Sequence, residues 1–497
     1  MKFPLAILSL LAFLPLAAGA EPLPGTQPLT PDPDFSATMV AGIDKMALRI
    51  IEQSTPLRKP TREKLKASLG MIDQRATVKA LELVGDLTTP ALLHETEQCR
   101  VFRVRWPVFD GVHGEGICIQ PKGKPHARLV LLPDADDAPE ELVDSRLLTA
   151  GCEVVILALV TRGTRFSITD RLAIRTDVPH REWIYRQSFQ LGRHLIGYEV
   201  QKTLAVVDWF KAQPEQLPVI VAGLGEGGML ALHAGALDER IDGVVSAGYF
   251  APREGVWQEP LDRNVFGLLR DLGDAEIASL VAPRPLVLQH AHYPEHTVNA
   301  KDGNGQRTIA GPGRLTEPKR SAFDAEVARA RALAPQGRLL AVGADGSEES
   351  IVRHLLSAAV ADRVLASLRT QVSAPSLAVD DTREERSVRE LGHFTQRLIV
   401  ACEAERHATF WNKVPLQPLA AFEAHTARER DRFWNEVIGR LPDPNVPVNA
   451  RSRFVRETEK VTIHEVTLDV WKDVFAWGWL CLPKDLKPGE SRPVVVC

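Results

Sequence analysis

The chain has 497 residues, with 60 Lys and Arg against 64 Asp and Glu, and a formal net charge of −4. This length predicts more than one domain, and the balanced, scattered charges exclude the basic footprint of a nucleic-acid-binding protein. Six cysteines in so long a chain exclude a disulfide scaffold. Most of them lie in apolar runs, so we expect buried thiols at Cys118, Cys152, Cys402 and Cys481. No Cys/His spacing of a zinc site is present, and neither a metal nor another cofactor is expected.

Residues 1–20 have the pattern of an export signal. Lys2 precedes an apolar run from Phe3 to Ala17, and Ala18-Gly19-Ala20 resembles a signal-peptidase site. The run is short for a bilayer span, although an N-terminal anchor is the alternative. The Pro-rich segment 21–34 is expected to be disordered. These features predict a periplasmic or secreted protein that has no membrane association once the signal is cleaved.

Residues 35–372 are predicted to form one α/β domain. A helix over Met39–Gln53 precedes two antiparallel strands, Arg100–Phe109 and His113–Gln120, joined at the turn pair Asp110-Gly111. Short apolar runs typical of buried parallel strands then alternate with helical segments. The runs are 129–132, 154–159, 219–222, 243–246, 286–289 and 339–342, and the helical segments are 139–150, 199–211, 227–236, 322–334 and 350–368. This order predicts a doubly wound, mostly parallel sheet with helices on both faces.

Residues 373–388 interrupt this alternation with a stretch rich in Ser, Pro, Asp and Glu, which we interpret as an interdomain linker. Two helical segments follow, at Leu391–Asn412 and Leu419–Leu441. Glu457–Lys484 then aligns without gaps onto Glu95–Lys122, and each copy is followed by an apolar strand, at 129–132 and at Val494–Val496. The repeat predicts that residues 389–497 are the N-terminal part of a second domain of the same type, truncated at Cys497.

A glycine-rich turn lies between the run Val219–Ala222 and a helix. The order strand, Gly223-x-Gly225-x-Gly227-Gly228, helix is the setting of the nucleophile elbow in α/β-hydrolases. An active enzyme has Ser, Cys or Asp at the central position, where this chain has Gly225. Glu226 is expected to contribute its backbone N–H rather than its side chain. The sequence thus predicts a degenerate elbow at Gly223, Gly225, Glu226, Gly227 and Gly228, without a confident catalytic residue.

The same glycines allow a second interpretation. Gly223-x-Gly225-x-x-Gly228 has the spacing of a dinucleotide fingerprint. That motif usually opens its fold, and an acidic residue closes the next strand. Here several strands precede it, and the next run, 243–246, ends without an acid. We therefore favour the elbow and expect no nucleotide cofactor.

The other positions of a catalytic triad are also without suitable residues. The strand 286–289 should be followed by the acid, but residues 290–295 follow with His290, His292 and Glu295. The strand 339–342 should be followed by the histidine, but residues 343–347 contain none. Residues 133–137 place three aspartates where the oxyanion would develop, which is the wrong charge. The first domain is therefore expected to be catalytically silent, and the two histidines with Glu295 are interpreted as a polar loop rather than a metal site.

Charged residues are dense among aromatic ones between residues 179 and 199. Arg181, Glu182, Arg186, Arg193 and Glu199 predict partly buried ion-pair networks. The alternative is an exposed aromatic and arginine surface that binds a sugar or an acidic polymer.

Several of these stretches resemble a known family. They are residues 179–183, 192–199, 246–250, 257–264 and 273–278. Together they resemble the large exported α/β-hydrolases of the acetyl-xylan-esterase-like and dienelactone-hydrolase-like group, over about residues 35–368. The resemblance implies two tandem modules and hydrolysis of carboxylic esters, often on acylated polysaccharide, although Gly225 stands where the family has its serine.

Two hypotheses follow for function. The first is an exported carboxylic-ester hydrolase related to carbohydrate acetyl esterases, whose catalytic residues belong to the second domain beyond Cys497. The alternative is a non-catalytic extracytoplasmic module on a hydrolase fold that binds polysaccharide or acts as a scaffold. Under both hypotheses we expect the protein to bind an ester or a polysaccharide and not a nucleic acid.

Overall fold

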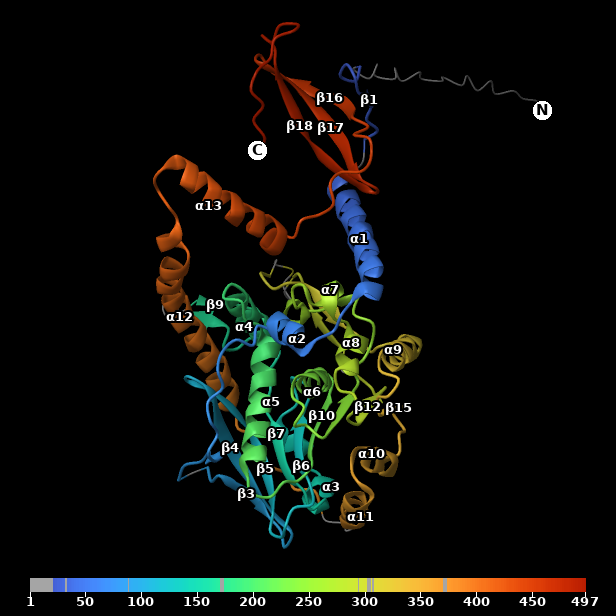
Figure 1. Cartoon of the computed structure of the whole chain (residues 1–497), viewed down its shortest axis with the longest axis vertical. Helices are drawn as coiled ribbons and strands as arrows, with labels where there is room; N and C mark the ends of the chain where they lie inside the picture. Colours follow the sequence, from blue (N-terminus) through green and yellow to red (C-terminus); the bar gives the residue numbers. More distant parts are fainter. Residues whose placement is uncertain are drawn as a thin grey trace, which may run out of the picture. The chain divides into compact units, whose positions relative to one another are not determined.

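The computed structural model of the chain describes residues 21–31, 34–87, 89–169, 174–293, 295–301, 305, 308–369 and 373–497. The predicted signal segment lies outside the described residues. The chain forms two compact units (Figure 1). One unit is Ser54–Lys413, and the other joins Met1–Gln53 to Val414–Cys497.

A ten-stranded sheet forms the centre of the unit Ser54–Lys413. Its order is β15 (Leu339–Val342), β12 (Leu286–Gln289), β11 (Gly243–Ala247), β10 (Val219–Leu224), β6 (Arg128–Leu132), β7 (Glu153–Leu157), β5 (Val112–Pro121), β4 (Cys99–Phe109) and β2 (Glu82–Leu83), and β3 (Leu92–Glu95) pairs with β4. Strands β15 to β7 pair in parallel, whereas β5 is antiparallel to both β7 and β4. This antiparallel lead-in to a crossed-over parallel sheet is of the α/β-hydrolase type and confirms the predicted fold class.

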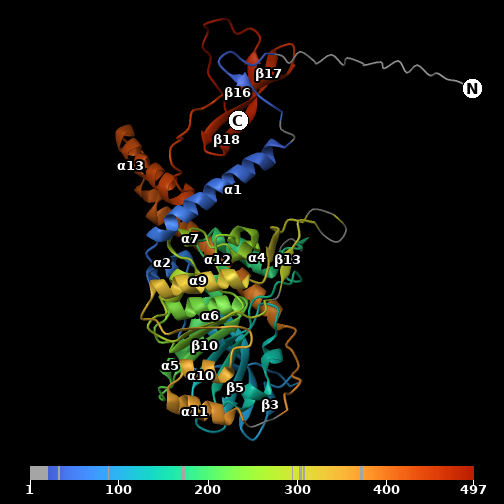
Figure 2. The ribbon, with the colours of Figure 1, turned by 90° about the vertical axis from the view of Figure 1, so that its right-hand side faces the viewer.

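Helices cover both faces of this sheet (Figures 1 and 2). One face carries α2 (Arg62–Ser68), α5 (Leu195–Ala212), α6 (Glu226–Leu237), α8 (Asp274–Ser279), α9 (Arg320–Leu333) and α12 (Arg383–Thr409). The other carries α3 (Ser145–Thr149), α10 (Glu348–Leu355) and α11 (Ala358–Ser367). Shorter elements are α4 (His180–Phe189), α7 (Leu268–Asp271), β8 (Ile168–Thr169), β9 (Ile174–Arg175), β13 (His296–Val298), β14 (Gly313–Leu315) and 3₁₀ turns at Thr55–Leu57, Pro139–Leu142, Val256–Gln258, Leu261–Arg263 and Trp411–Lys413. Because both faces are covered, the central strands can be almost continuously apolar.

The segment interpreted as a linker is built into this unit. Helix α12 begins at Arg383, inside the range 373–388, and Val388, Leu391 and Phe394 are buried in the core of the sheet. These three residues follow one another at helical spacing, so they form a stripe that faces the core. The boundary of the compact unit is therefore at Lys413 and not between residues 373 and 388.

The second unit contains a four-stranded sheet in the order β1 (Gln27–Pro28), β16 (Arg451–Glu457), β17 (Val461–Trp471) and β18 (Val474–Pro483). It also contains α1 (Phe35–Ser54) and α13 (Leu419–Arg432), which continues into a π-helical turn at Phe433–Ile438. β1 pairs in parallel with β16, so part of the segment 21–34 is ordered, contrary to expectation. The expected strand at Val494–Val496 is not formed, and these residues are exposed.

The internal repeat has the same backbone pairing in both copies. The hairpin β4–β5 runs from Cys99↔Pro121 to Phe109↔Val112, and β17–β18 runs from Val461↔Pro483 to Trp471↔Val474. Each hairpin has one register irregularity, after Pro107 and after the equivalent Asp469. The preceding pairs, β3–β4 and β16–β17, also share an irregularity at equivalent positions. A slip of one residue would reverse every side chain, so the two copies pair their three strands in the same register.

The cysteines are free and only partly buried. Cys118 and Cys152 are buried, as predicted. Cys402 is half-buried on the outer end of α12 and Cys481 is exposed on β18, so the prediction was wrong for these two thiols. Among the described residues, no helix is both long enough and apolar enough to cross a bilayer.

Candidate functional site: an occupied nucleophile elbow and an adjacent cavity

The predicted elbow is a tight turn between a strand and a helix. Gly225 lies between β10 and α6 with φ +60° and ψ −120°, a conformation that residues with a Cβ rarely adopt. Its N–H donates to the carbonyl of Ala247 at 3.0 Å. A Cβ on Gly223 would overlap the carbonyl of Gly227, and a Cβ on Gly227 would overlap that of Leu132. The tight turn therefore depends on these glycines, which is the mechanical role the motif predicts.

The space above Gly225 is filled by Asp134. A Cβ on Gly225 would overlap the Asp134 carboxylate. This carboxylate accepts the N–H of Glu226 at 2.9 Å, the amide that would help to bind an oxyanion in an active hydrolase. Arg162 holds the same carboxylate through two guanidinium nitrogens, at 2.6 and 3.2 Å, and all of these groups are buried. A carboxylate of the protein itself therefore occupies both the place of the nucleophile and the oxyanion donor.

The side chain of Glu226 is enclosed by arginines. It is completely buried and lies 2.9 Å from Arg263, 3.5 Å from Arg162 and 3.6 Å from Arg181. Burial by itself would raise the pKa of Glu226, but the three guanidinium groups outweigh it and hold the pKa at about 2. An ionised carboxylate in such a cluster is a poor general base near neutral pH, so Glu226 gains no support as a catalytic residue.

The ion network extends into α4 and α5. Arg181 pairs with Glu199 through two contacts of 3.0 Å and with Asp262 at 3.0 Å, all within the interior. Arg193 on the preceding loop pairs with Asp73 at 2.7 Å. The predicted buried network is thus confirmed. Buried pairs of this kind fix local geometry more reliably than they add stability.

The side chains that follow β12, at the expected position of the acid, have separate partners. His290 Nε2 lies 2.9 Å from the carbonyl of Pro318, whereas His292 pairs with Glu317 at 3.0 Å. Glu295 pairs separately with Arg314, also at 3.0 Å. These side chains have different partners, and the described part of the chain contains no group of three or more His, Cys, Asp or Glu placed to hold a metal ion.

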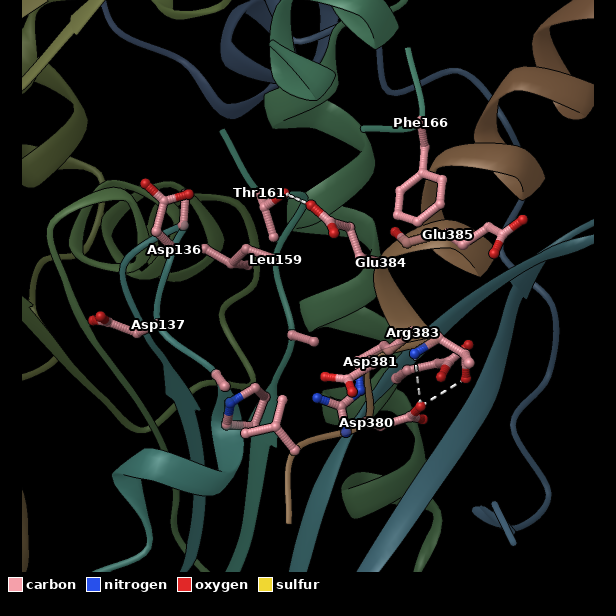
Figure 3. A pocket seen from close by; sticks show the side chains of 18 of the residues that line it. Asp136, Asp137, Leu159, Thr161, Phe166, Asp380, Asp381, Arg383, Glu384 and Glu385 are labelled. Carbon is pink, nitrogen blue, oxygen red and sulfur yellow. Dashed lines mark hydrogen bonds between the residues drawn. The ribbon is translucent and has the colours of Figure 1, made fainter. Parts of the chain in front are cut away.

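A cavity of about 490 Å³ lies beside the elbow loops (Figure 3). Its walls come from residues 135–139, 158–166 and 379–387. Asp136 and Asp137 line one side, and Asp380, Asp381 and Glu384 line the other. Sequence reasoning missed this cavity, because the third wall was interpreted as a linker.

Three polar side chains join the cavity walls. Thr161 donates a hydrogen bond to Glu384 (Figure 3). His180 Nδ1 lies 3.1 Å from the same carboxylate. The N–H of Phe166 donates to His180 Nε2 at 2.8 Å, so this nitrogen is an acceptor and the proton of the neutral ring is on Nδ1. Burial lowers the pKa of His180, and Glu384 opposes that shift. Both ring nitrogens are engaged, so the group pins the start of α12 rather than shuttling protons.

The lining of the cavity combines the amine of Lys202 with several carboxylates. Lys202 is almost completely buried, and its Nζ donates to Ser387 at 3.2 Å. Burial lowers the pKa of Lys202. Burial and then the neighbouring Asp134 raise the pKa of Asp137. Carboxylate acceptors together with the cationic donors Lys202 and Arg165 in a single cavity are suited to binding hydroxyl groups.

No protein-family model and no curated protein matches this chain. Solved structures with a similar fold include acetyl xylan esterase 1 from Thermoanaerobacterium sp., at 14% identity over 61% of this chain and 92% of that chain, with a TM-score of 0.39. The acetyl xylan esterase from Paenibacillus sp. R4 is similar at 15% identity over 61% and 98%, with a TM-score of 0.39. A carbohydrate esterase family 15 glucuronoyl esterase from Caldicellulosiruptor kristjansonii is similar at 13% identity over 66% and 91%, with a TM-score of 0.34.

Proposed function

We propose that the unit Ser54–Lys413 is a non-catalytic binding module of an exported protein, built on a hydrolase scaffold. One observation carries this proposal: the Asp134 carboxylate lies where a nucleophile would stand and accepts the N–H of Glu226. An ester above this elbow would find no attacking side chain at Gly225 and would find the N–H of Glu226 already bonded to Asp134. It would also meet a negative charge that repels the developing oxyanion.

The ligand we propose is a neutral carbohydrate held in the cavity of Figure 3. The volume of about 490 Å³ is within the usual range of small-molecule sites. Asp137 and Asp381 form no ion pair among the described residues, so their oxygens can accept hydrogen bonds from sugar hydroxyls. The excess of carboxylates in the lining disfavours an anionic polymer.

Calorimetric titration of the full chain with acetylated and deacetylated xylo-oligosaccharides tests this proposal, beside an assay of p-nitrophenyl acetate hydrolysis. We expect saturable binding and no turnover. Asp137→Ala should weaken binding about tenfold, since a hydrogen bond to a charged group is lost. Asp362→Asn is the matched control, because Asp362 is exposed on α11 and outside the cavity lining. Ester turnover, or binding unaffected by Asp137→Ala, would contradict the proposal.

The repeated strands favour a second candidate function. The shared register irregularities support a second unit of the same type that begins with β16–β18. For this second unit we propose carboxylic-ester hydrolysis. The unit Ser54–Lys413 would then position the acylated substrate. An open reading frame that continues past Cys497 into a strand followed by Gly-x-Ser-x-Gly supports this candidate, and a stop codon directly after Cys497 contradicts it.

A further inference from the structure

The repeat extends further than the strands. Before the first hairpin the chain has α1, then Pro56-Leu57 and Pro60, then α2. Before the second hairpin it has α12, then Pro415-Leu416 and Pro418, then α13. The order helix, Pro-Leu segment, helix, hairpin is the same in both copies. On this order α1 and α12 are the leading helices of the two repeats.

Both boundaries between the compact units lie between the leading helix of a repeat and the Pro-Leu segment that follows it. One boundary follows Gln53 at the end of α1, and the other follows Lys413, after α12. The next residues are the Pro-Leu segments. Helix α2 remains with the first hairpin, since Leu65 and Leu69 are buried in the core of Ser54–Lys413. Each leading helix is therefore in the compact unit that contains the hairpin of the other repeat, and β1, which precedes α1, is in that unit as well.

Helix α12 packs on the hairpin of the first repeat. The Glu390 carboxylate accepts the N–H of His113 at 2.9 Å, just after the turn. The ring of Phe394 lies 4.8 Å from that of Phe109. Arg397 donates to the carbonyl of Asp110, the first residue of the turn, at 2.7 Å. The helix thus runs beside β5 toward the turn.

Helix α1 packs on the second strand and the turn of the hairpin of the second repeat. The ring of Phe35 lies 5.9 Å from that of Trp477 on β18, and Gly42 is close to the carbonyl of Asp473. Arg49 donates to the carbonyl of Lys472 at 2.9 Å. Lys472 is the first residue of its turn and aligns with Asp110 in the repeat. In both units, an arginine of a leading helix therefore binds the same carbonyl of the hairpin.

We infer that the two repeats have exchanged their leading helices, and that the second strand and turn of each hairpin form a docking surface for the leading helix of the other repeat. Short proline-containing segments between the helices are suitable hinges for such an exchange, as in domain-swapped proteins. One consequence concerns the cavity of Figure 3, because Glu384 and Ser387 in its wall belong to α12 and hence to the second repeat. This inference does not depend on the proposed ligand.

Amide hydrogen exchange of the full chain, resolved by mass spectrometry, tests the inference. Ala41→Pro breaks α1 at an exposed position, and Gln396→Pro does the same in α12. We expect Ala41→Pro to accelerate amide exchange at least about tenfold in residues 461–483 and to leave 99–121 unchanged, and Gln396→Pro to do the reverse. Helices that pack on the hairpins of their own repeats would give the opposite pattern and overturn the inference.

Milder variants cover the case in which a proline variant does not fold. Arg49→Ala should accelerate amide exchange only at the turn that contains Lys472, and Arg397→Ala only at the turn that contains Asp110. Val400→Ala, at an exposed site on α12, should change neither turn. Light scattering completes the test, and we expect the mass of a single chain. A dimer with the same amide protection would mean that the leading helices are swapped between two copies of the chain, which would overturn the inference that they are swapped within one chain.

Discussion

Replacing Gly225 by serine tests whether the elbow is occupied or merely lacks its nucleophile. The new Cβ would overlap the Asp134 carboxylate, and a non-glycine backbone in an unfavourable region costs about 1–3 kcal/mol. If Asp134 moves away, Arg162 loses a two-nitrogen contact and the N–H of Glu226 loses its acceptor. Removing one partner of a buried ion pair costs about 3–5 kcal/mol. We therefore expect Gly225→Ser to lower the free energy of unfolding by at least about 3 kcal/mol.

Urea denaturation followed by tryptophan fluorescence measures this loss. Gly225→Ala introduces the same Cβ without a hydroxyl and should be destabilised equally. Gly255→Ala is the control, since a Cβ there meets nothing within 4 Å, and it should change stability by no more than about 0.5 kcal/mol. Neither Gly225 variant should hydrolyse p-nitrophenyl acetate. A serine variant as stable as the unmodified protein, or with more ester turnover than the alanine variant, would refute the reasoning.

Three further predictions concern buried charges. Burial raises the pKa of Asp274 from 3.8 to about 7, so the stability that its protonated form provides is lost as the pH rises through this range. In thermal unfolding, the Asp274→Asn variant should be more stable than the unmodified protein at about pH 8 but not at about pH 4. Burial would raise the pKa of Glu226, but Arg263, Arg181 and Arg162 lower it from 4.5 to about 2. The contribution of Glu226 to the free energy of unfolding is therefore lost as the pH falls from 4.5 to 2. Urea titrations at several pH values should show a smaller loss of stability in acid for Glu226→Gln than for the unmodified protein. Arg383→Ala removes a buried pair with Glu140, at 2.6 and 2.9 Å, and should cost about 3–5 kcal/mol in urea denaturation, whereas Arg389→Ala, at an exposed pair, should cost less than about 1 kcal/mol.

The fold could be predicted where its determinants are local in sequence. Asp110-Gly111 identifies the hairpin, and runs such as 154–157 and 219–222 identify buried strands, because their period and turn residues depend only on near neighbours. Helix α12 was assigned to the wrong unit because its anchors are distant: Arg386 pairs with Glu115, and Arg103 binds the carbonyl of Ala378. Composition alone cannot distinguish a polar linker from a polar segment that is fixed by such long-range ion pairs.

In the candidate site, too, only the features that depend on local sequence could be predicted. Gly225 and the acidic loop at Asp134 are visible as a strand-turn-helix motif and a charge pattern, and their juxtaposition follows from the neighbouring positions of β6 and β10 in the sheet. Arg162 and Arg263 as partners of Glu226 were not predictable, since they come from loops whose course depends on tertiary packing. The cavity required α12 as a wall and was missed for the same reason.

The elbow therefore resembles a hydrolase whose oxyanion site already contains an anion, supplied by Asp134. The double variant Gly225→Ser with Asp134→Gly separates this occupancy from the absence of a triad. It frees the N–H of Glu226 and makes room for a serine, while Arg162 keeps contacts with Asp136 and Glu226. The serine should then cost about 3–5 kcal/mol less than it does in the single variant, because it no longer displaces Asp134 from Arg162, whereas the cost of the backbone conformation remains. Ester turnover should still be absent, since residues 343–347 offer no histidine to activate the serine. Turnover by the double variant alone would show that another base reaches the elbow and that Asp134 by itself keeps the site inactive.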